Sequence, residues 1–520
     1  DHSKILAASS GEKIIPEFQR LFDAAIAGDV ETVTNMYADF KQRHPQYERK
    51  KGIPSNIRLW NPAWEDVLDI CMAYDHVANC NSKYTQIFVD DLFNSIPPGS
   101  IYFGGTDPGR GLPTAFSKSH VDADPFYTLT QNALANSAYL DYLRDTYGER
   151  RHWLSVLAEA HRTDSELQKS DGEFQNALDN EVSLMSEHPE NDPRCEAADK
   201  TTEELRKKRN QRADELLAKT QAQMDPQKKA KFLSEPPQVI YIPNTEDSQK
   251  AFDDYAGDVQ QRLAHDEKFP NEPHQAKPGE SVTKGANGKP VVSGQIAVMG
   301  INGLISKVIF DKNPDREFYL EESFPLDWMF PYLEPHGLIM KINREPLAHL
   351  PEDVVQRDHD YWQKLVGGMI GNWLTDDTSV QTVTEFAERV YLHKDLNGFT
   401  GDPQFVQDSY APKMFSKLRS SIGGVYSWRL GQPPSGGVMP AQYIAKDKTE
   451  RARMEKAADF AFKQSFAICP YSPEAVYRYV QLLVNDHRVP DALLIAETAS
   501  RIDPANGQFT YLIRNLKQMH

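Results

Sequence analysis

The last seventy residues repeat a helical pattern with a fixed period, and this feature constrains the fold more than any other. Pro470 and Pro504 each follow an apolar run, and the two prolines are 34 residues apart. The small residues Ala458 and Ala492 occupy matching positions within those runs. Small side chains let paired helices approach closely, and proline stops the second helix of each pair. We therefore expect repeated helical pairs over 451–520.

An apolar segment that leads into a glycine-rich loop and then a helix predicts an α/β layer earlier in the chain. Residues 100–103 indicate a buried strand, 104–110 the loop, and 139–147 part of the following helix. The expected fold class is an α+β or α/β core with a helical insertion, plus all-α helical repeats at the C-terminus. Further short apolar segments are expected to be strands: 238–242, 317–320 and 337–342.

Changes in composition divide the chain into parts. Residues 151–233 are rich in Glu, Lys, Gln, Asp and Ala, which predicts a solvated helical hairpin that interrupts the core. A partner-binding coiled coil is the alternative for this segment, although its apolar residues keep no sustained heptad. The expected parts are an N-terminal helical segment at 1–84, the core at 85–150 and 234–348, the helical insertion at 151–233, a helical linker region at 349–450, and the repeats at 451–520.

Charge and hydropathy argue against two classes of partner. The chain carries 58 basic and 75 acidic side chains, a net charge of −17, whereas a protein that reads nucleic-acid phosphates needs a basic face. The longest apolar runs, such as 296–301, are far shorter than the ~20 residues of a membrane-spanning helix. We expect no nucleic-acid partner. The chain begins at Asp1 rather than Met, so we expect a processed chain or part of a longer one, with membrane attachment only through a segment upstream.

The four cysteines are too few for a disulfide scaffold and show no zinc-binding spacing. Cys71 and Cys80 are nine residues apart, so a bend between them would be needed to join them. A bridge between these two cysteines stays open, and so does the redox compartment.

The loop at 104–110 contains the most suggestive candidate ligand-binding residues, Thr106, Asp107 and Arg110. Ligand groups collect at strand ends in α/β folds, glycines let a backbone approach closely, and arginine can grip a carboxylate or phosphate. The loop lacks the Lys-Ser/Thr pair of a P-loop and the glycine pattern of a dinucleotide site. The alternative is a structural turn in which Asp107 caps local amides and Arg110 pairs with an acid.

A polar cluster follows ten residues further on, where His120, Asp122 and Asp124 alternate. His120 joins the candidate ligand-binding residues, together with Gln131 and Asn132 on the next segment. A divalent cation could use these oxygens and the imidazole. The segment is also typical of an exposed loop that leads into a helix, and no metal site is predicted.

Two other acidic segments are weaker candidates. Residues 395–408 echo a calcium loop but lack its spacing and its closing glutamate. Glu321 and Glu322 stand beside aromatic residues, yet neighbours on a strand point to opposite faces, which weakens a paired-carboxylate site. Neither segment is predicted to be catalytic, and no cofactor is expected.

Two segments together resemble a known family. One is Ile96–Arg110, which reads IPPGSIYFGGTDPGR, continued by 124–148 with its QNAL motif at 131–134. The other is Ile305–Arg344, which contains DREFY and LEPHGL. Both resemble the soluble C-terminal portion of bacterial membrane proteins classed as protein O-mannosyltransferase-like. In that family an extracytoplasmic α/β domain follows a many-spanning glycosyltransferase module, and helical repeats sometimes come after it. The 34-residue period is similar to repeats of the tetratricopeptide type.

The resemblance implies an accessory role, because the family's transferase machinery acts from loops between spans that this sequence lacks. We expect a non-catalytic, extracytoplasmic binding protein associated with cell-envelope glycosylation, with a protein, peptide or glycan partner. Its contact surfaces would be the 104–110 loop and the C-terminal helical pairs. One alternative is an enzyme that acts on an anionic or sugar substrate, with Asp107, Arg110 and His120 lining the site. The other is a self-assembling structural subunit, a homo-oligomer joined through 150–232 and the repeats.

Overall fold

A computed structural model describes residues 1–519 except 45–55, 106–107, 118–124, 189–191, 236–237, 273, 278, 285–289, 293, 322–324 and 434–438. The described chain forms two compact units. Unit 1 contains Asp1–Ala78, Arg110–Asp124 and Asn136–Asn244, and unit 2 contains Asn79–Gly109, Pro125–Ala135 and Thr245–His520. The secondary structure is mostly helical, with one small mixed sheet and a two-stranded ribbon. The α+β class predicted from the sequence is confirmed at this level.

Local sequence signals set the helix ends in unit 1. Pro16 stands at the first helical position of α2, where its missing N–H costs nothing. Gly28, with a φ of +72°, follows that helix, and Asp29 then caps α3 by accepting from the Thr32 amide. The helices of this unit are α1 (His2–Ser9), α2 (Pro16–Ile26), α3 (Val30–Arg43), η1 (Ile57–Leu59), α4 (Trp64–Asn79), most of α6 (Pro108–Phe116), α7 (Ser137–Thr146), η3 (Glu149–Trp153), α8 (Leu154–Thr163), α9 (Ser165–Glu187), α10 (Pro193–Gln223) and α11 (Pro226–Ser234).

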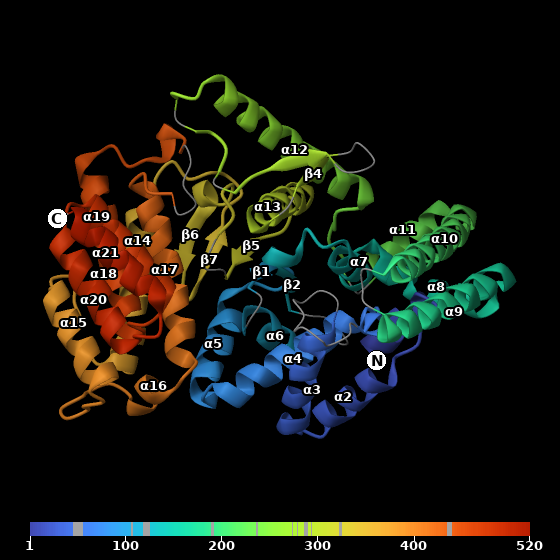
Figure 1. The fold of residues 1–520 in the computed structure, drawn as a ribbon, viewed down its shortest axis with the longest axis horizontal. Helices are drawn as coiled ribbons and strands as arrows, with labels where there is room; N and C mark the ends of the chain where they lie inside the picture. Colours follow the sequence, from blue (N-terminus) through green and yellow to red (C-terminus); the bar gives the residue numbers. More distant parts are fainter. Residues whose placement is uncertain are drawn as a thin grey trace. The chain divides into compact units, whose positions relative to one another are not determined.

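Aromatic packing holds the first helices of unit 1 together. Phe18, Phe40 and Trp64, from α2, α3 and α4, have ring centroids 5.7 to 6.2 Å apart. The long helices α9 and α10 lie side by side as an antiparallel hairpin (Figure 1), and Arg209 of α10 lies over the Phe174 ring of α9 at 4.2 Å. The helical structure predicted for 151–233 is therefore present, as η3 and α8 to α11.

The sheet of unit 2 has five strands in the order β2-β1-β5-β7-β6. Its first three strands, β2 (Tyr127–Thr130), β1 (Ile101–Gly104) and β5 (Phe318–Leu320), are parallel. Every residue of these strands is buried, as is usual for parallel strands covered on both faces. The other two, β7 (Ile339–Ile342) and β6 (Leu333–His336), are antiparallel to their neighbours and form a hairpin.

A glycine turn, a two-stranded ribbon and several helices complete unit 2. Gly337 turns the β6–β7 hairpin with a φ of +64°, a conformation that glycine adopts without strain. A separate ribbon pairs β3 (Val282–Lys284) with β4 (Pro290–Val292). The helices are α5 (Ser82–Ser95), η2 (Gln131–Ala133), α12 (Thr245–Lys268), α13 (Gln295–Lys312), η4 (Phe330–Tyr332), α14 (Glu352–Ile370), α15 (Val380–Ala387), η5 (Glu388–Leu392), α16 (Pro403–Gln407), α17 (Ala411–Arg429), η6 (Ala441–Tyr443), α18 (Lys448–Ile468), α19 (Pro473–Asn485), α20 (Val489–Ile502) and α21 (Gly507–Met519).

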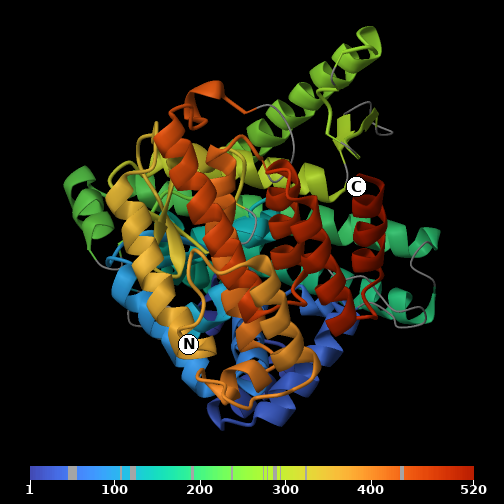
Figure 2. The same cartoon turned by 90° about the vertical axis from the view of Figure 1, so that its left-hand side faces the viewer.

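The C-terminal helices pack in chain order. Each of α18 to α21 contacts the helix before it, and α17 packs along α18; Figure 2 shows the last four helices in red. Nearly all of α17 is buried, including Arg419, which pairs with Asp358 of α14 at 2.8 Å. Tyr426 also donates to the Asp358 carboxylate at 2.7 Å, and Gln464 accepts from the Arg419 guanidinium at 2.7 Å. This helical part of unit 2 therefore encloses a charged pair whose polar atoms are satisfied.

One predicted strand is wrong, and the strands β2 and β6 were not predicted. Residues 238–242 form no strand, although Ile240 is buried and donates its amide to the Tyr147 carbonyl. A short apolar segment can be buried with a single backbone hydrogen bond, without pairing into a β-sheet. The strands predicted at 317–320 and 337–342 are present as β5 and β7. None of the described helices is both long and apolar enough to cross a membrane.

Candidate functional site

The carboxyl edge of the three parallel strands is the place where this fold would collect ligand groups. Strand register puts Gly104 of β1 beside Thr130 of β2, and Phe103 beside Leu320 of β5. The residues that follow each strand, among them Glu321, therefore come to one edge of the sheet. Parallel strands direct their carboxyl ends the same way, which is why the sequence predicted candidates here.

Glu321 and the glycines of the loop after β1 pack closely against one another. The buried Glu321 carboxylate accepts from the Gly105 amide at 3.0 Å. A Cβ placed on Gly109 would collide with the same carboxylate, and one on Gly104 would collide with the Gly109 carbonyl. Glycine is required at both positions because the backbone and the Glu321 side chain fill the space. The described part of this loop is thus held by an internal hydrogen bond and by close packing.

Gln131 and Asn132 lie at the same edge, in η2, which begins directly after β2. Gln131 is fully buried, and its amide donates to the Asn132 side chain at 3.3 Å. The buried Asn302 of α13 accepts from the Ala135 amide at 2.6 Å and donates to the Asn132 carbonyl at 3.1 Å. Asn302 thus fixes the loop after β2. Sequence reasoning missed it, because an Asn inside an apolar helical run gives no signal of its distant partner.

Arg110 belongs to unit 1 and is buried there among acids of α4. Its guanidinium donates to the Glu65 carboxylate at 2.7 Å and also pairs with Asp69, and it lies 5.1 Å from the Tyr139 ring centroid. Glu65, Asp69 and Tyr139 are all buried, and Arg110 itself is 4% exposed. Burial opposes the charge, but the Asp69 and Glu65 carboxylates outweigh it and raise the pKa of Arg110. The cation stays charged and engaged.

The remaining predicted residues, Thr106, Asp107 and His120, lie outside the described residues, as do Asp122 and Asp124. The structure therefore brings Gln131 and Asn132 to the strand edge and places Arg110 in the acidic centre of unit 1. Within the weaker candidate segment at 395–408, the acids accept hydrogen bonds from nearby backbone amides. Asp402 and Asp408 also accept from residues 81–84 at the start of α5. The described residues contain no group of three or more His, Cys, Asp or Glu arranged to hold a metal ion.

A second polar cluster of unit 1 surrounds Asp66 on α4. Its carboxylate accepts from Ser3 at 2.6 Å and from Tyr142 at 3.1 Å, and it pairs with the His2 imidazole at 3.0 Å. These donors tie α1 and α7 to α4. Sequence reasoning missed this cluster because its members are 63 to 76 residues apart from Asp66.

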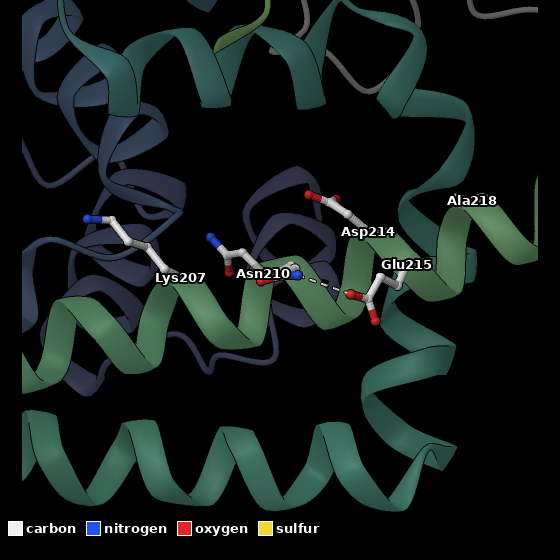
Figure 3. A pocket seen from close by; sticks show the side chains of 6 residues that line it. Lys207, Asn210, Asp214, Glu215 and Ala218 are labelled. Atoms are coloured by element: carbon white, nitrogen blue, oxygen red, sulfur yellow. Dashed lines mark hydrogen bonds between the residues drawn. The ribbon is translucent and has the colours of Figure 1, made fainter. Parts of the chain in front are cut away.

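Two surface hollows in the described part of unit 1 lie on the long helix α10. One, of about 560 Å³, is lined by α10 alone, mostly by polar side chains that include Lys207, Asn210 and Asp214 (Figure 3). The other, of about 380 Å³, lies between α8 and α10 on an apolar floor that includes Leu157 and Leu216. Neither hollow contains a residue predicted from the sequence.

All four cysteines are free, buried thiols, so the bridge left open between Cys71 and Cys80 is not formed. Burial raises the pKa of the Cys80 thiol to about 11, which keeps it protonated and unreactive at neutral pH. Comparisons with protein-family models, with curated proteins and with solved structures found no match for this chain.

Proposed function

We propose that this protein is a non-catalytic, extracytoplasmic binding protein associated with cell-envelope glycosylation, and that its partner is a protein, peptide or glycan. The observation that carries the proposal is the position of Arg110. An enzyme with an anionic substrate needs a cation that can reach that substrate, but the Arg110 guanidinium is buried and already holds two carboxylates. Arg110, the candidate residue best suited to bind an anion, is thus already bound to carboxylates of the protein itself.

The C-terminal helices supply the binding surface in this proposal, as repeats of the tetratricopeptide type. Three observations support that interpretation. The helices α18 to α21 pack in chain order, and the small residues Ala458 and Ala492 are fully buried. Helices α18 and α20 end at Ile468 and Ile502, directly before the two segments that contain the periodic prolines. Stacked helical pairs present extended faces that bind other chains.

The link to glycosylation and to the cell envelope rests on the resemblance of Ile96–Arg110 and Ile305–Arg344 to the O-mannosyltransferase-like proteins. In those proteins an equivalent domain would stand beside a membrane-embedded transferase. A domain that binds the acceptor protein or the glycan would serve such a transferase without performing chemistry itself.

A specific observation favours one alternative, an enzyme acting on a sugar or anionic substrate at the strand edge. The Glu321 carboxylate is buried beside the glycine-rich loop, and buried carboxylates are the acid and base groups of sugar chemistry. In the described loop its Oε2 accepts from a backbone amide, which is also what a structural carboxylate does.

The experiment presents the full-length protein to a glycan array, to random peptide display libraries and, separately, to activated sugar donors and simple glycosides. The proposal predicts saturable binding in the array or libraries and no new product by mass spectrometry. Product formation that is lost in Glu321→Gln, but retained in the control variant Glu345→Gln at an exposed glutamate of unit 2, would establish the enzyme instead. Assembly into large particles without any ligand would favour the structural subunit.

A further inference from the structure

Basic side chains gather in one stretch of unit 1, although the chain as a whole is acidic. Residues 206–231 contain nine Lys or Arg and three acids, a net charge of +6, whereas the whole chain carries −17. The stretch runs through the second half of α10 and most of α11. A local excess of charge opposite to that of the whole chain attracts ligands of one sign to that place.

Most of the basic residues of α10 are already paired within unit 1. Lys208 pairs with Glu173 of α9 at 3.6 Å, and the buried Arg209 pairs with Glu12 at 3.0 Å. The other cations of this stretch with carboxylate partners are Arg206, Lys207 and Arg212. These charges hold the helical hairpin together, so α10 is not the surface at which a charged ligand would bind.

Helix α11 differs, because it contains three lysines and no acid. Lys228 and Lys231 are exposed, and within the described part of the chain no ion pair joins either ammonium to a carboxylate. The third lysine, Lys229, donates to the Gln221 side chain at 3.4 Å, which sets the first turn of α11 beside the last turn of α10 (Figure 1). Two unpaired cations therefore stand on a short helix at the end of the hairpin.

The two acids that flank α11 do not cancel its charge. Asp225 caps the helix, and its carboxylate accepts from the Gln227 and Lys228 amides at 3.0 and 3.1 Å. Glu235 follows the last helical residue, and no described ion pair joins it to a lysine of α11. The neighbouring η3 contributes two arginines and one acid. The surface around α11 is therefore net basic.

The apolar residues of α11 are turned toward η3. The Phe232 ring lies 4.9 Å from the Trp153 ring and 5.6 Å from the His152 ring, centroid to centroid. Leu233 beside it is half-buried. The exposed residues keep helical spacing on the outward face, which is formed by Gln227, Ala230, Lys231 and Ser234, with Lys228 at its edge.

We propose that this basic face of α11, defined by Gln227, Lys228, Ala230, Lys231 and Ser234, binds an acidic glycan whose sugars carry carboxylates. The inference rests on the proposed binding function and narrows its glycan partner to one surface and one chemical class. The two lysine ammoniums pair with carboxylates, and their flexible stems follow a ligand whose acidic groups have no fixed orientation. The Gln227 amide and the Ser234 hydroxyl supply hydrogen bonds to sugar hydroxyls.

The composition of the face separates a glycan from other acidic partners. Interfaces between proteins are enriched in aromatic residues and depleted in lysine, whereas this face has two lysines and no aromatic residue. A membrane surface needs apolar side chains that insert into it, but those of α11 pack on η3. Duplex nucleic acid carries one charge per about 1.7 Å, and the acidic remainder of the chain repels so dense a polyanion. An acidic glycan has its charges further apart, with hydroxyls between them.

The test measures binding of the full-length chain to immobilised polygalacturonate and to its methyl ester, which has the same sugar backbone without the charges. We expect saturable binding to polygalacturonate alone, and this binding should weaken as salt rises because exposed charges are screened. Lys228→Glu/Lys231→Glu should bind about tenfold more weakly. Both positions are exposed, so the variant should keep the circular dichroism spectrum of the unchanged protein.

The matched control is Lys4→Glu/Lys200→Glu, which changes the net charge by the same amount. Lys4 of α1 and Lys200 of α10 are exposed residues of unit 1, and no described ion pair involves either ammonium. The control should bind polygalacturonate like the unchanged protein. An equal loss in both variants would assign the binding to overall charge and overturn the inference.

Further outcomes separate the inference from the function beneath it. Equal binding to the methyl ester, or stronger binding to a single-stranded oligonucleotide or to phosphatidylglycerol vesicles, would overturn the acidic glycan as the ligand. Absence of polygalacturonate binding, with hits among neutral glycans or peptides, would overturn the inference and leave the proposed function standing. Failure of polygalacturonate, the glycan array and the peptide libraries together would remove the proposed function itself.

Discussion

Arg110 and Arg514 show how one residue type serves two purposes in this protein. Arg110 is buried in unit 1 between Glu65 and Asp69, and both acids belong to α4. Arg514 lies on the outward face of α21, where its described contact is the exposed ring of Tyr511. The first arginine satisfies carboxylates that the fold itself has buried. The second offers its charge to whatever approaches the surface.

The comparison teaches that a residue whose sequence context suggests ligand binding need not be accessible to a ligand in the folded protein. Arg110 follows a glycine-rich loop at a strand end, the usual setting of a ligand-binding arginine. Arg514 stands in an ordinary helical segment and attracts no attention. Burial reverses their roles, because a desolvated cation must be paired, whereas an exposed cation can stay unpaired at little cost.

The largest expected effect comes from removing the buried cation. Arg110→Met leaves Glu65 and Asp69 buried without a counter-charge, so we expect a loss of about 3–5 kcal/mol in the unfolding free energy of unit 1. Chemical denaturation followed by tryptophan fluorescence measures it. An unchanged transition, together with altered ligand binding, would make Arg110 a ligand residue and break the comparison.

The buried pair of unit 2 sharpens the same point. Asp358→Ala leaves Arg419 buried and unpaired, and we expect a cost of about 3–5 kcal/mol. Replacing both residues, as Asp358→Leu/Arg419→Met, should cost much less, because no charge is then stranded. Denaturation of the three proteins side by side supplies the measurement. Equal losses for the single and double variants would show that packing rather than charge sets the effect.

A buried imidazole extends the comparison to pH. Burial lowers the pKa of His44 from 6.5 to about 3, where its ring stacks on Trp64 at 3.9 Å. Because the folded-state pKa lies below the unfolded one, His44 stabilises the protein fully above pH 6.5, and that stability is lost as the pH falls toward 3. We expect a loss on the order of 3 kcal/mol across this window.

His44→Gln should flatten the pH dependence of unfolding between pH 6.5 and 3. The control is His274→Gln, since the His274 side chain is 74% exposed, and it should keep the slope of the unchanged protein. If His44→Gln keeps this slope, other buried groups cause the pH dependence of unfolding.

The smallest expected effect comes from removing the exposed cation. Arg514→Ala should change the unfolding free energy of unit 2 by less than about 0.5 kcal/mol, as is usual for surface substitutions away from caps and buried partners. Thermal denaturation checks this value. A loss of several kcal/mol would mean that Arg514 holds the helical stack together and is not a free surface cation.

The sequence predicted several of the helices and strands, but not which distant residues pair with one another. The segment at 1–84 was expected to be helical, and its described residues contain α1 to α4. The strands β1, β5 and β7 are present near the expected positions. The pairing of Arg110 with an acid was one of the two alternatives that the sequence left open. Its actual partners could not be predicted, because Glu65 and Asp69 lie 45 and 41 residues away and only the fold brings them close.

The outward position of some aromatic residues could not be predicted for a different reason. Tyr477 and Tyr511 follow helical spacing like core residues, and a sequence does not say which aromatic side chains a helix turns outward. Residues 238–242 show the opposite error, where apolar composition suggested a strand although the segment is buried without one. In both cases tertiary packing decides the outcome: which side chains a helix exposes, and whether an apolar segment becomes a strand.

The most direct test of the account maps a ligand onto the chain. Backbone amide hydrogen exchange of the full-length protein is measured with and without a peptide selected from the random display libraries. We predict slower exchange in α19 and α21 on binding, and unchanged exchange at 101–117 and 131–134. Protection of the strand-edge segments with none in α19 or α21 would contradict the account and return the function to the loop after β1.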